Sequence, residues 1–128
     1  MDNSYQLIKI DPDWGQLRVE IEFIGLVNAD YELVLWEANA NIRVMDNKGT
    51  NHNSVPDKYD LPAPNSKNNG RALQCKTFIT FLYDDTNAEN EAIMKLYQAN
   101  STEPVCVVSE VYSKGTTNHA EGELIIDF

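Results

Sequence analysis

Basic residues are scarce in this sequence, and long apolar runs are absent. The 128 residues include 10 lysines and arginines against 20 acids, which gives a net charge of −10. We therefore expect no nucleic-acid binding through a basic patch and no docking on a membrane of anionic lipid, since both need a basic face. No stretch approaches the roughly 18 consecutive apolar residues of a membrane-spanning helix. Residues 1–6 lack the basic and apolar regions of a signal peptide, so we expect a cytoplasmic location.

Cysteine and histidine are also rare, at two residues each. Cys75 and Cys106 both lie in apolar stretches, where an unpaired cysteine behaves as a small hydrophobic residue. We expect two buried thiols, and a disulfide between them is the alternative. His52 and His119 end similar segments, which we interpret as one kind of turn used twice. The alternative is that both histidines form a ligand pair at one end of the fold.

Motifs for metal binding and catalysis are missing. The sequence has no Cys-x-x-Cys, no His-Glu-x-x-His and no EF-hand loop, so we expect no metal and no cofactor. It has no Gly-x-Ser-x-Gly elbow, and both cysteines lie in strand-like stretches that are typical of a core. We therefore predict that the protein is not an enzyme.

What the sequence does contain is a two-residue alternation of apolar and polar residues, which is typical of strands with one buried face. The predicted class is mainly β, an antiparallel sandwich or barrel. A chain of 128 residues allows one core, so we expect a single domain over residues 1–128. The alternation predicts strands at residues 17–23, 31–36, 73–83, 105–112 and 124–128, and a short one near 5–10. The residues expected to be buried are Phe23, Leu35, Ile79, Phe81, Val107 and Ile126.

One segment has a helical pattern instead. Thr86 and Glu89 fit a capping box at the start of a helix. Apolar residues then recur at helical spacing, at Ala92, Ile93, Leu96, Tyr97 and Ala99. The pattern predicts one α-helix at about residues 87–99, docked on a sheet by its apolar stripe.

Residues 46–70 are rich in asparagine and proline, so they predict a long loop with a short strand near 58–61. Tyr59 and Leu61 are too apolar to be left in water, so we expect this loop to contact a neighbouring chain. The alternative is that both side chains fold back on their own sandwich. Trp14 and Trp36 stand at loop or strand edges, which is typical of packing or of an interface anchor. A sugar-stacking platform is the alternative for the two tryptophans.

The order of elements in the second half of the chain resembles a known layout. The strand at 73–83 is followed by the predicted helix, the strand at 105–112, a turn at Lys114-Gly115 and the closing strand at 124–128. This order is similar to that of the tail-tube proteins of phages and contractile injection systems, including the Hcp-like tube family. The resemblance covers residues 71–128, and the loop at 46–70 looks like the inter-ring loop of those proteins. It implies a self-assembling homo-oligomer in a virion or injection particle, and it transfers no functional residue.

These features predict a non-catalytic structural or interaction protein, tail-tube-like, that self-assembles or docks in a larger complex. Its expected partners are proteins, either further copies of itself or another assembly subunit, because some strands are apolar on faces where a lone sandwich would be polar. The first alternative is a small acidic inhibitor or immunity-type protein that masks a basic partner. The second is a carbohydrate- or Ca²⁺-binding module, in which Asp84, Asp85 and Glu89 would offer oxygen ligands to the ion.

Overall fold

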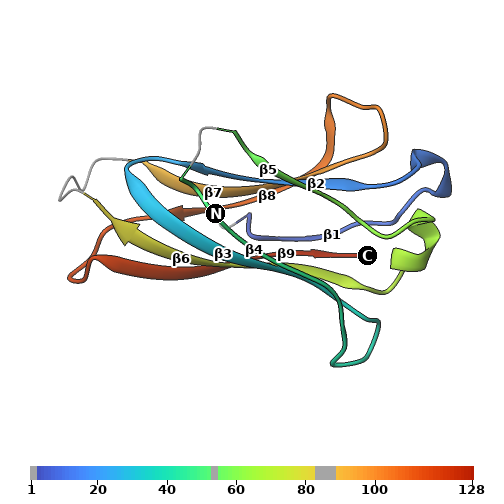
Figure 1. Ribbon diagram of the computed structural model, residues 1–128, viewed down its shortest axis with the longest axis horizontal. Coiled ribbons are helices and arrows are strands. Elements are labelled where there is room, and N and C mark those ends of the chain that lie inside the picture. Colours follow the sequence, from blue (N-terminus) through green and yellow to red (C-terminus); the bar gives the residue numbers. More distant parts are fainter. Residues whose placement is uncertain (1–2, 53–54, 83–88) are drawn as a thin grey trace.

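The alternating pattern builds two β-sheets that face each other across an apolar core (Figure 1). The computed structural model describes residues 3–52, 55–82 and 89–128. The five-stranded sheet has the order β1-β9-β6-β3-β4, with strands Tyr5–Leu7, His119–Asp127, Ala72–Phe81, Val27–Trp36 and Arg43–Thr50. The four-stranded sheet has the order β5-β2-β7-β8, with strands Asp57–Asp60, Arg18–Ile24, Asn90–Tyr97 and Pro104–Tyr112. Two short 3₁₀ helices, η1 (Pro12–Trp14) and η2 (Asn65–Asn68), lie in the connections.

Strand pairing confirms the mainly β sandwich and leaves both sheets open, so the barrel alternative is wrong. Paired strands are antiparallel except for β1, which runs parallel to β9. The N-terminal segment joins the two sheets along one side. The Ser109 N–H of β8 donates to the Asn3 carbonyl at 3.0 Å, and the Ile125 N–H of β9 donates to the Ser4 carbonyl at 2.8 Å.

The core lies between the sheets and contains the inward half of each long strand. Four of the residues expected there are buried: Leu35, Ile79, Phe81 and Ile126. Phe23 is only partly buried at the margin of the core. The prediction for Val107 is wrong, because its side chain is 42% exposed. The inward face of β8 instead carries Cys106, Val108 and Tyr112, since both faces of this strand are apolar in the sequence.

The predicted α-helix is wrong, because residues 90–97 form β7 between β2 and β8. Met94 and Leu96 point into the core, and Ile93 and Tyr97 are buried on the opposite face of the strand. An apolar run of this kind fits a helix and a buried strand equally well, and hydrogen bonding to a neighbour on each side decides for the strand. The predicted cap at Thr86 and the helix start at residues 87–88 lie outside the described residues.

The long loop predicted at 46–70 is shorter and more ordered than expected. Strand β4 continues to Thr50, and β5 confirms the short strand expected near residues 58–61. Asparagines hold the rest in place, because the Asn68 side chain donates to the Pro62 carbonyl at 3.1 Å and the Asn65 side chain to the Asp11 carbonyl at 3.0 Å. Both asparagines are buried, so their amides replace the pairing that regular structure would supply.

Tyr31 of β3 closes one open side of the sandwich. Its ring lies over Gly49 of the neighbouring strand β4, where a Cβ would overlap the phenol. Its hydroxyl lies 2.5 Å from an Asp57 oxygen and 2.5 Å from the Tyr59 hydroxyl, both on β5 of the other sheet. Burial and these hydrogen bonds raise the pKa of Tyr31 well above its usual value.

Tyr112 of β8 closes the opposite side in the same way. Its ring lies over Gly122 of β9, and its hydroxyl is 2.5 Å from Thr77 Oγ1 on β6, where both residues are buried. Each tyrosine thus uses a glycine on the five-stranded sheet to reach a hydrogen-bonding partner in the opposite sheet.

Candidate interaction surface

The outer face of the five-stranded sheet, away from the core, carries side chains in rows that run across the strands. The registers of β1, β9, β6, β3 and β4 define these rows. The aromatic row contains Leu7, Asp127, Ala72, Trp36 and Arg43. The middle row contains Tyr5, Ile125, Gln74, Val34 and Asp46. The charge row contains Glu123, Lys76, Glu32 and Lys48, and the Phe78 row contains Glu121, Phe78, Asp30 and Thr50.

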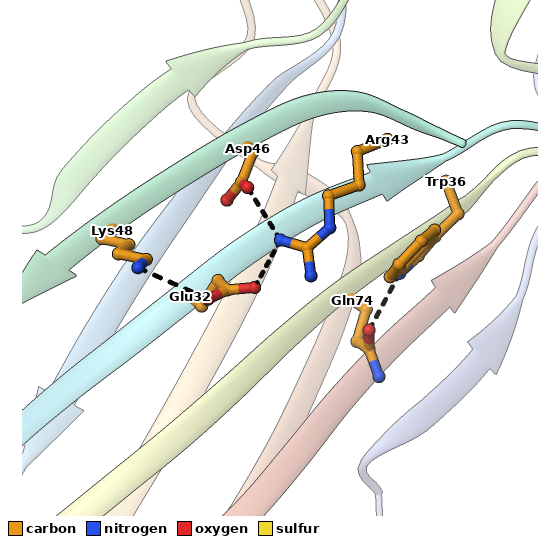
Figure 2. A network of polar contacts seen from close by, with 6 residues as sticks. All are labelled: Glu32, Trp36, Arg43, Asp46, Lys48 and Gln74. Carbon is orange, nitrogen blue, oxygen red and sulfur yellow. Dashed lines mark hydrogen bonds and ion pairs between the residues drawn. The ribbon is translucent and has the colours of Figure 1, made fainter. Parts of the chain in front are cut away.

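Trp36 lies at the end of β3, and its indole is held on both its edge and its face (Figure 2). The indole N–H donates to Gln74 Oε1 at 2.9 Å, and the Arg43 guanidinium lies 5.2 Å from the ring centroid. These contacts fix the orientation of the ring on the sheet. The Arg43 guanidinium also covers one face of the indole. Less of the ring is therefore open for the sugar stacking that the sequence suggested as an alternative.

Arg43 is the centre of an ionic network on the same face (Figure 2). Its Nη1 lies 2.8 Å from Glu32 Oε1 and 2.7 Å from Asp46 Oδ2. Lys48 Nζ approaches the other oxygen of Glu32 at 4.0 Å. Hydrogen bonds to Asp46 and then Glu32 raise the pKa of Arg43. Val34, flanked by these groups, is only 1% exposed although it points away from the core.

Apolar side chains on β1 and β9 extend this surface toward the sheet edge. Leu7 is 70% exposed and Tyr5 is 53% exposed, and Ile125 lies beside Tyr5 in the register. The Tyr5 hydroxyl donates to Asp127 at 2.7 Å, which raises the pKa of Tyr5. Aromatic and arginine side chains bordered by charged residues have the composition of a protein interface, with anchors in the middle and a polar rim.

The interface residues predicted from the sequence divide between this surface and the core. Trp36 is on the outer face, but Leu61 is fully buried and its N–H donates to the Leu17 carbonyl at 2.8 Å. The prediction that Leu61 contacts a neighbouring chain is therefore wrong. Tyr59 is partly buried against the core and bound to Tyr31, and Trp14 packs against the core from η1. The loop residues thus fold back on their own sandwich.

Sequence reasoning missed most of this surface. Arg43 and Glu32 come from different strands, and Tyr5 and Leu7 from the first strand. The alternating pattern places Arg43 and Glu32 at polar positions of their strands, which was the available signal for these two residues. It gave no such signal for Tyr5 and Leu7, which are apolar and alternate with Gln6. What the sequence does not give is the register that sets residues of five strands side by side.

The two histidines and the two cysteines take no part in the Arg43 network. His119 is on β9 and His52 follows β4, so β6 and β3 separate them by about 14 Å at the usual strand spacing. That distance is too large for a shared ion. Cys75 and Cys106 are free and buried, as expected. Burial raises the pKa of the Cys75 thiol to about 12 and raises that of Cys106, which disfavours the thiolate form of both.

Hollows in the described part of the chain differ in size. Open ones of about 600 Å³ and 520 Å³ lie beside Phe78, one toward Glu121 and the other toward Asp30 and Lys48. A cavity of about 160 Å³ lies between β2 and the connection from β4 to β5, lined in part by Ile21, Phe23, Asn51 and Asp57. Pockets for small ligands usually have about 300–1,000 Å³. Among residues 3–52, 55–82 and 89–128, no three His, Cys, Asp or Glu side chains form a metal-binding group. The pair Asp84-Asp85 lies outside these residues.

Neither 3₁₀ helix in the described residues, nor any other helix there, is long and apolar enough to cross a membrane. Comparisons with protein-family models, with curated proteins and with solved structures find no match for this chain.

Proposed function

We propose that the protein is a non-catalytic structural or interaction protein that binds other protein chains through the outer face of its five-stranded sheet. The observation that carries this proposal is the aromatic row, in which Trp36 lies beside Arg43 and the exposed Leu7 lies at the opposite edge of the sheet. Tryptophan, tyrosine and arginine are the residues that most often dominate the binding free energy of protein interfaces.

The physical argument concerns pre-organisation. Gln74 and Arg43 already hold the Trp36 ring, so little side-chain entropy remains to be lost when a partner covers it. The exposed side chains of Leu7 and Tyr5 add apolar area that is unfavourable in water. A partner that covers these groups gains the hydrophobic contribution while the charges at the rim select its orientation.

The test is photo-crosslinking in cells that make the protein. Phe78, which is 44% exposed on this face, is replaced by p-benzoylphenylalanine, and Val107, which is 42% exposed on the other sheet, serves as the matched control. We expect a covalent protein adduct from position 78 and not from position 107. The adduct should disappear when Trp36→Ala is added. Equal labelling from both positions, or none from either, contradicts the proposal.

The tail-tube form of this function stays a prediction from resemblance. Its layout requires a helix after the long strand, and the chain has β7 there. A second candidate, the acidic inhibitor, is favoured by the net charge of −10. In that case the crosslinked partner is a basic protein, and its affinity for the chain falls steeply with salt.

A further inference from the structure

We propose that the partner that binds the outer face of the five-stranded sheet is a second copy of this chain. This inference rests on the function proposed above. The two five-stranded sheets pack face to face about a two-fold axis that runs parallel to the strands, between β6 and β3. The outer face is complementary to itself under this rotation, as the registers of its rows show.

A two-fold axis in this direction reverses the order of the strands but keeps each row opposite itself. Strand β9 then faces β4 of the second copy, and β6 faces β3. Strand β1 lies outside these facing strands, so Tyr5 and Leu7 stay at the rim of the dimer interface. In the charge row, Glu123 meets Lys48 of the second copy. Lys76 likewise meets Glu32 of the second copy. With the symmetric equivalents, all four residues of the row face an opposite charge.

The aromatic row is complementary under the same axis. Asp127 faces Arg43 of the second copy, again with opposite charges. Ala72 faces Trp36 of the second copy, so a small side chain leaves room for a large one. Each of the two rows carries a net charge of zero, although the whole chain carries −10.

The two remaining rows place no acid against an acid. The facing pairs are Ile125 with Asp46, Gln74 with Val34, Glu121 with Thr50 and Phe78 with Asp30. An axis across the strands through the charge row would instead set each charged residue against its own copy. Like charges in contact are strongly unfavourable at an interface, so the strand-parallel axis is preferred.

Two members of the charge row are available for new partners. Lys76 and Glu123 form no ion pair within the part of the chain that is described, whereas Glu32 already binds Arg43 at 2.8 Å. Lys48 approaches Glu32 only at 4.0 Å and its side chain is 77% exposed. Pairing Lys48 and Glu123 between copies therefore breaks no short ion pair.

The size of the face sets the expected strength. Four strands about 4.8 Å apart and four rows about 6.8 Å apart cover about 500 Å² of sheet. This is at the low end of specific interfaces, which bury about 800 Å² per partner. We therefore expect a dimer with a dissociation constant in the micromolar range.

The first experiment is sedimentation equilibrium of the purified chain from about 1 to 500 μM. We expect a monomer–dimer equilibrium that weakens when salt rises from about 50 to about 500 mM, because salt screens the facing charges. If net repulsion between two acidic chains dominated, salt would strengthen association. That result, or a monomer at every concentration, overturns the proposal.

Charge reversal then tests the register. Lys48→Glu or Glu123→Lys alone turns two attractive pairs of the dimer into repulsive ones, and we expect each to weaken dimerisation about tenfold or more. The double variant restores opposite charges and should recover most of the affinity. Lys67→Glu and Glu103→Lys are the matched controls, because both residues are exposed, carry the same charges and lie off this face. They should change the dissociation constant less than about twofold.

Failure of this inference is distinguishable from failure of the proposed function. A monomer in solution whose position 78 crosslinks to a different protein refutes the second copy but leaves the interaction function intact. A dimer that ignores both reversals refutes the register and the face together. Far-ultraviolet circular dichroism of each variant checks that the fold is unchanged.

Discussion

Replacing Gly122 with alanine should destabilise the protein far more than replacing Gly115. A Cβ at position 122 would overlap the phenol oxygen and two ring carbons of Tyr112, whereas one at position 115 meets nothing within 4 Å. Tyr112 must tilt away, which strains the packing by about 1–3 kcal/mol. The tilt also breaks the buried hydrogen bond to Thr77, whose loss costs about 1–3 kcal/mol more.

The lower conformational entropy of an unfolded alanine offsets about 0.4–1 kcal/mol of this. We expect a net loss of about 1–5 kcal/mol, centred near 3, in the free energy of unfolding for Gly122→Ala, and a thermal midpoint about 10 °C lower. Gly115→Ala should change the free energy by less than about 0.5 kcal/mol. Urea unfolding followed by tryptophan fluorescence measures both, with the m-value as a check on two-state behaviour.

A double-mutant cycle identifies the cause. Tyr112→Phe removes the phenol oxygen, which is the atom that a Cβ at position 122 approaches most closely. Gly122→Ala should therefore be less costly in the Tyr112→Phe background by about 1 kcal/mol or more. If both glycine variants have equal stability, or if the two changes are additive, Tyr112 does not depend on the glycine and the reasoning fails.

Two further predictions concern the core. Leu61→Ala should lower the free energy of unfolding by about 2–5 kcal/mol, because Leu61 is fully buried. Urea titration measures this loss, and a value below about 1 kcal/mol would show that Leu61 is not part of the core. The free energy of unfolding should also fall as the pH rises from about 9 toward 12. The folded chain keeps the Cys75 proton, because its pKa is raised to about 12, while the unfolded chain releases it above the ordinary value of 9.0. Cys75→Ala should remove part of this slope and leave the part due to Tyr31 and Cys106, whose pKa values are also raised, and an unchanged slope would contradict the assignment.

The strands could be predicted from the sequence because one buried face imposes a two-residue period, as in β2, where Val19 and Ile21 alternate with Glu20 and Glu22. The same reasoning failed for β7. Its outward positions include Ile93 and Tyr97, so the run is apolar on both faces and carries no clear period. What removed the ambiguity was pairing with β2 and β8, which lie far away in the sequence.

The candidate site was predictable only in part. Trp36 stood out as a large aromatic residue in a strand, and it is on the outer face. Nothing local in the sequence relates it to Ala72 or places Asp127 next in the same row. Leu61 illustrates the opposite error, because a largely polar loop can still bury one leucine completely when asparagine side chains anchor the backbone around it.

The position of β9 has a consequence for how the chain is made. This last strand is inserted between β1 and β6, so the first strand has no partner in its sheet until residues 125–127 exist. At about 5–20 residues per second, roughly 6–24 s pass between the synthesis of β1 and that of β9. Once β6 has been made, the edge that will pair with β9 stays open until β9 follows, and an unpaired strand edge is a common starting point for aggregation. The five-stranded sheet is thus completed only after β9 has been made, and nascent chains that have not yet reached β9 should depend on chaperones to stay in solution.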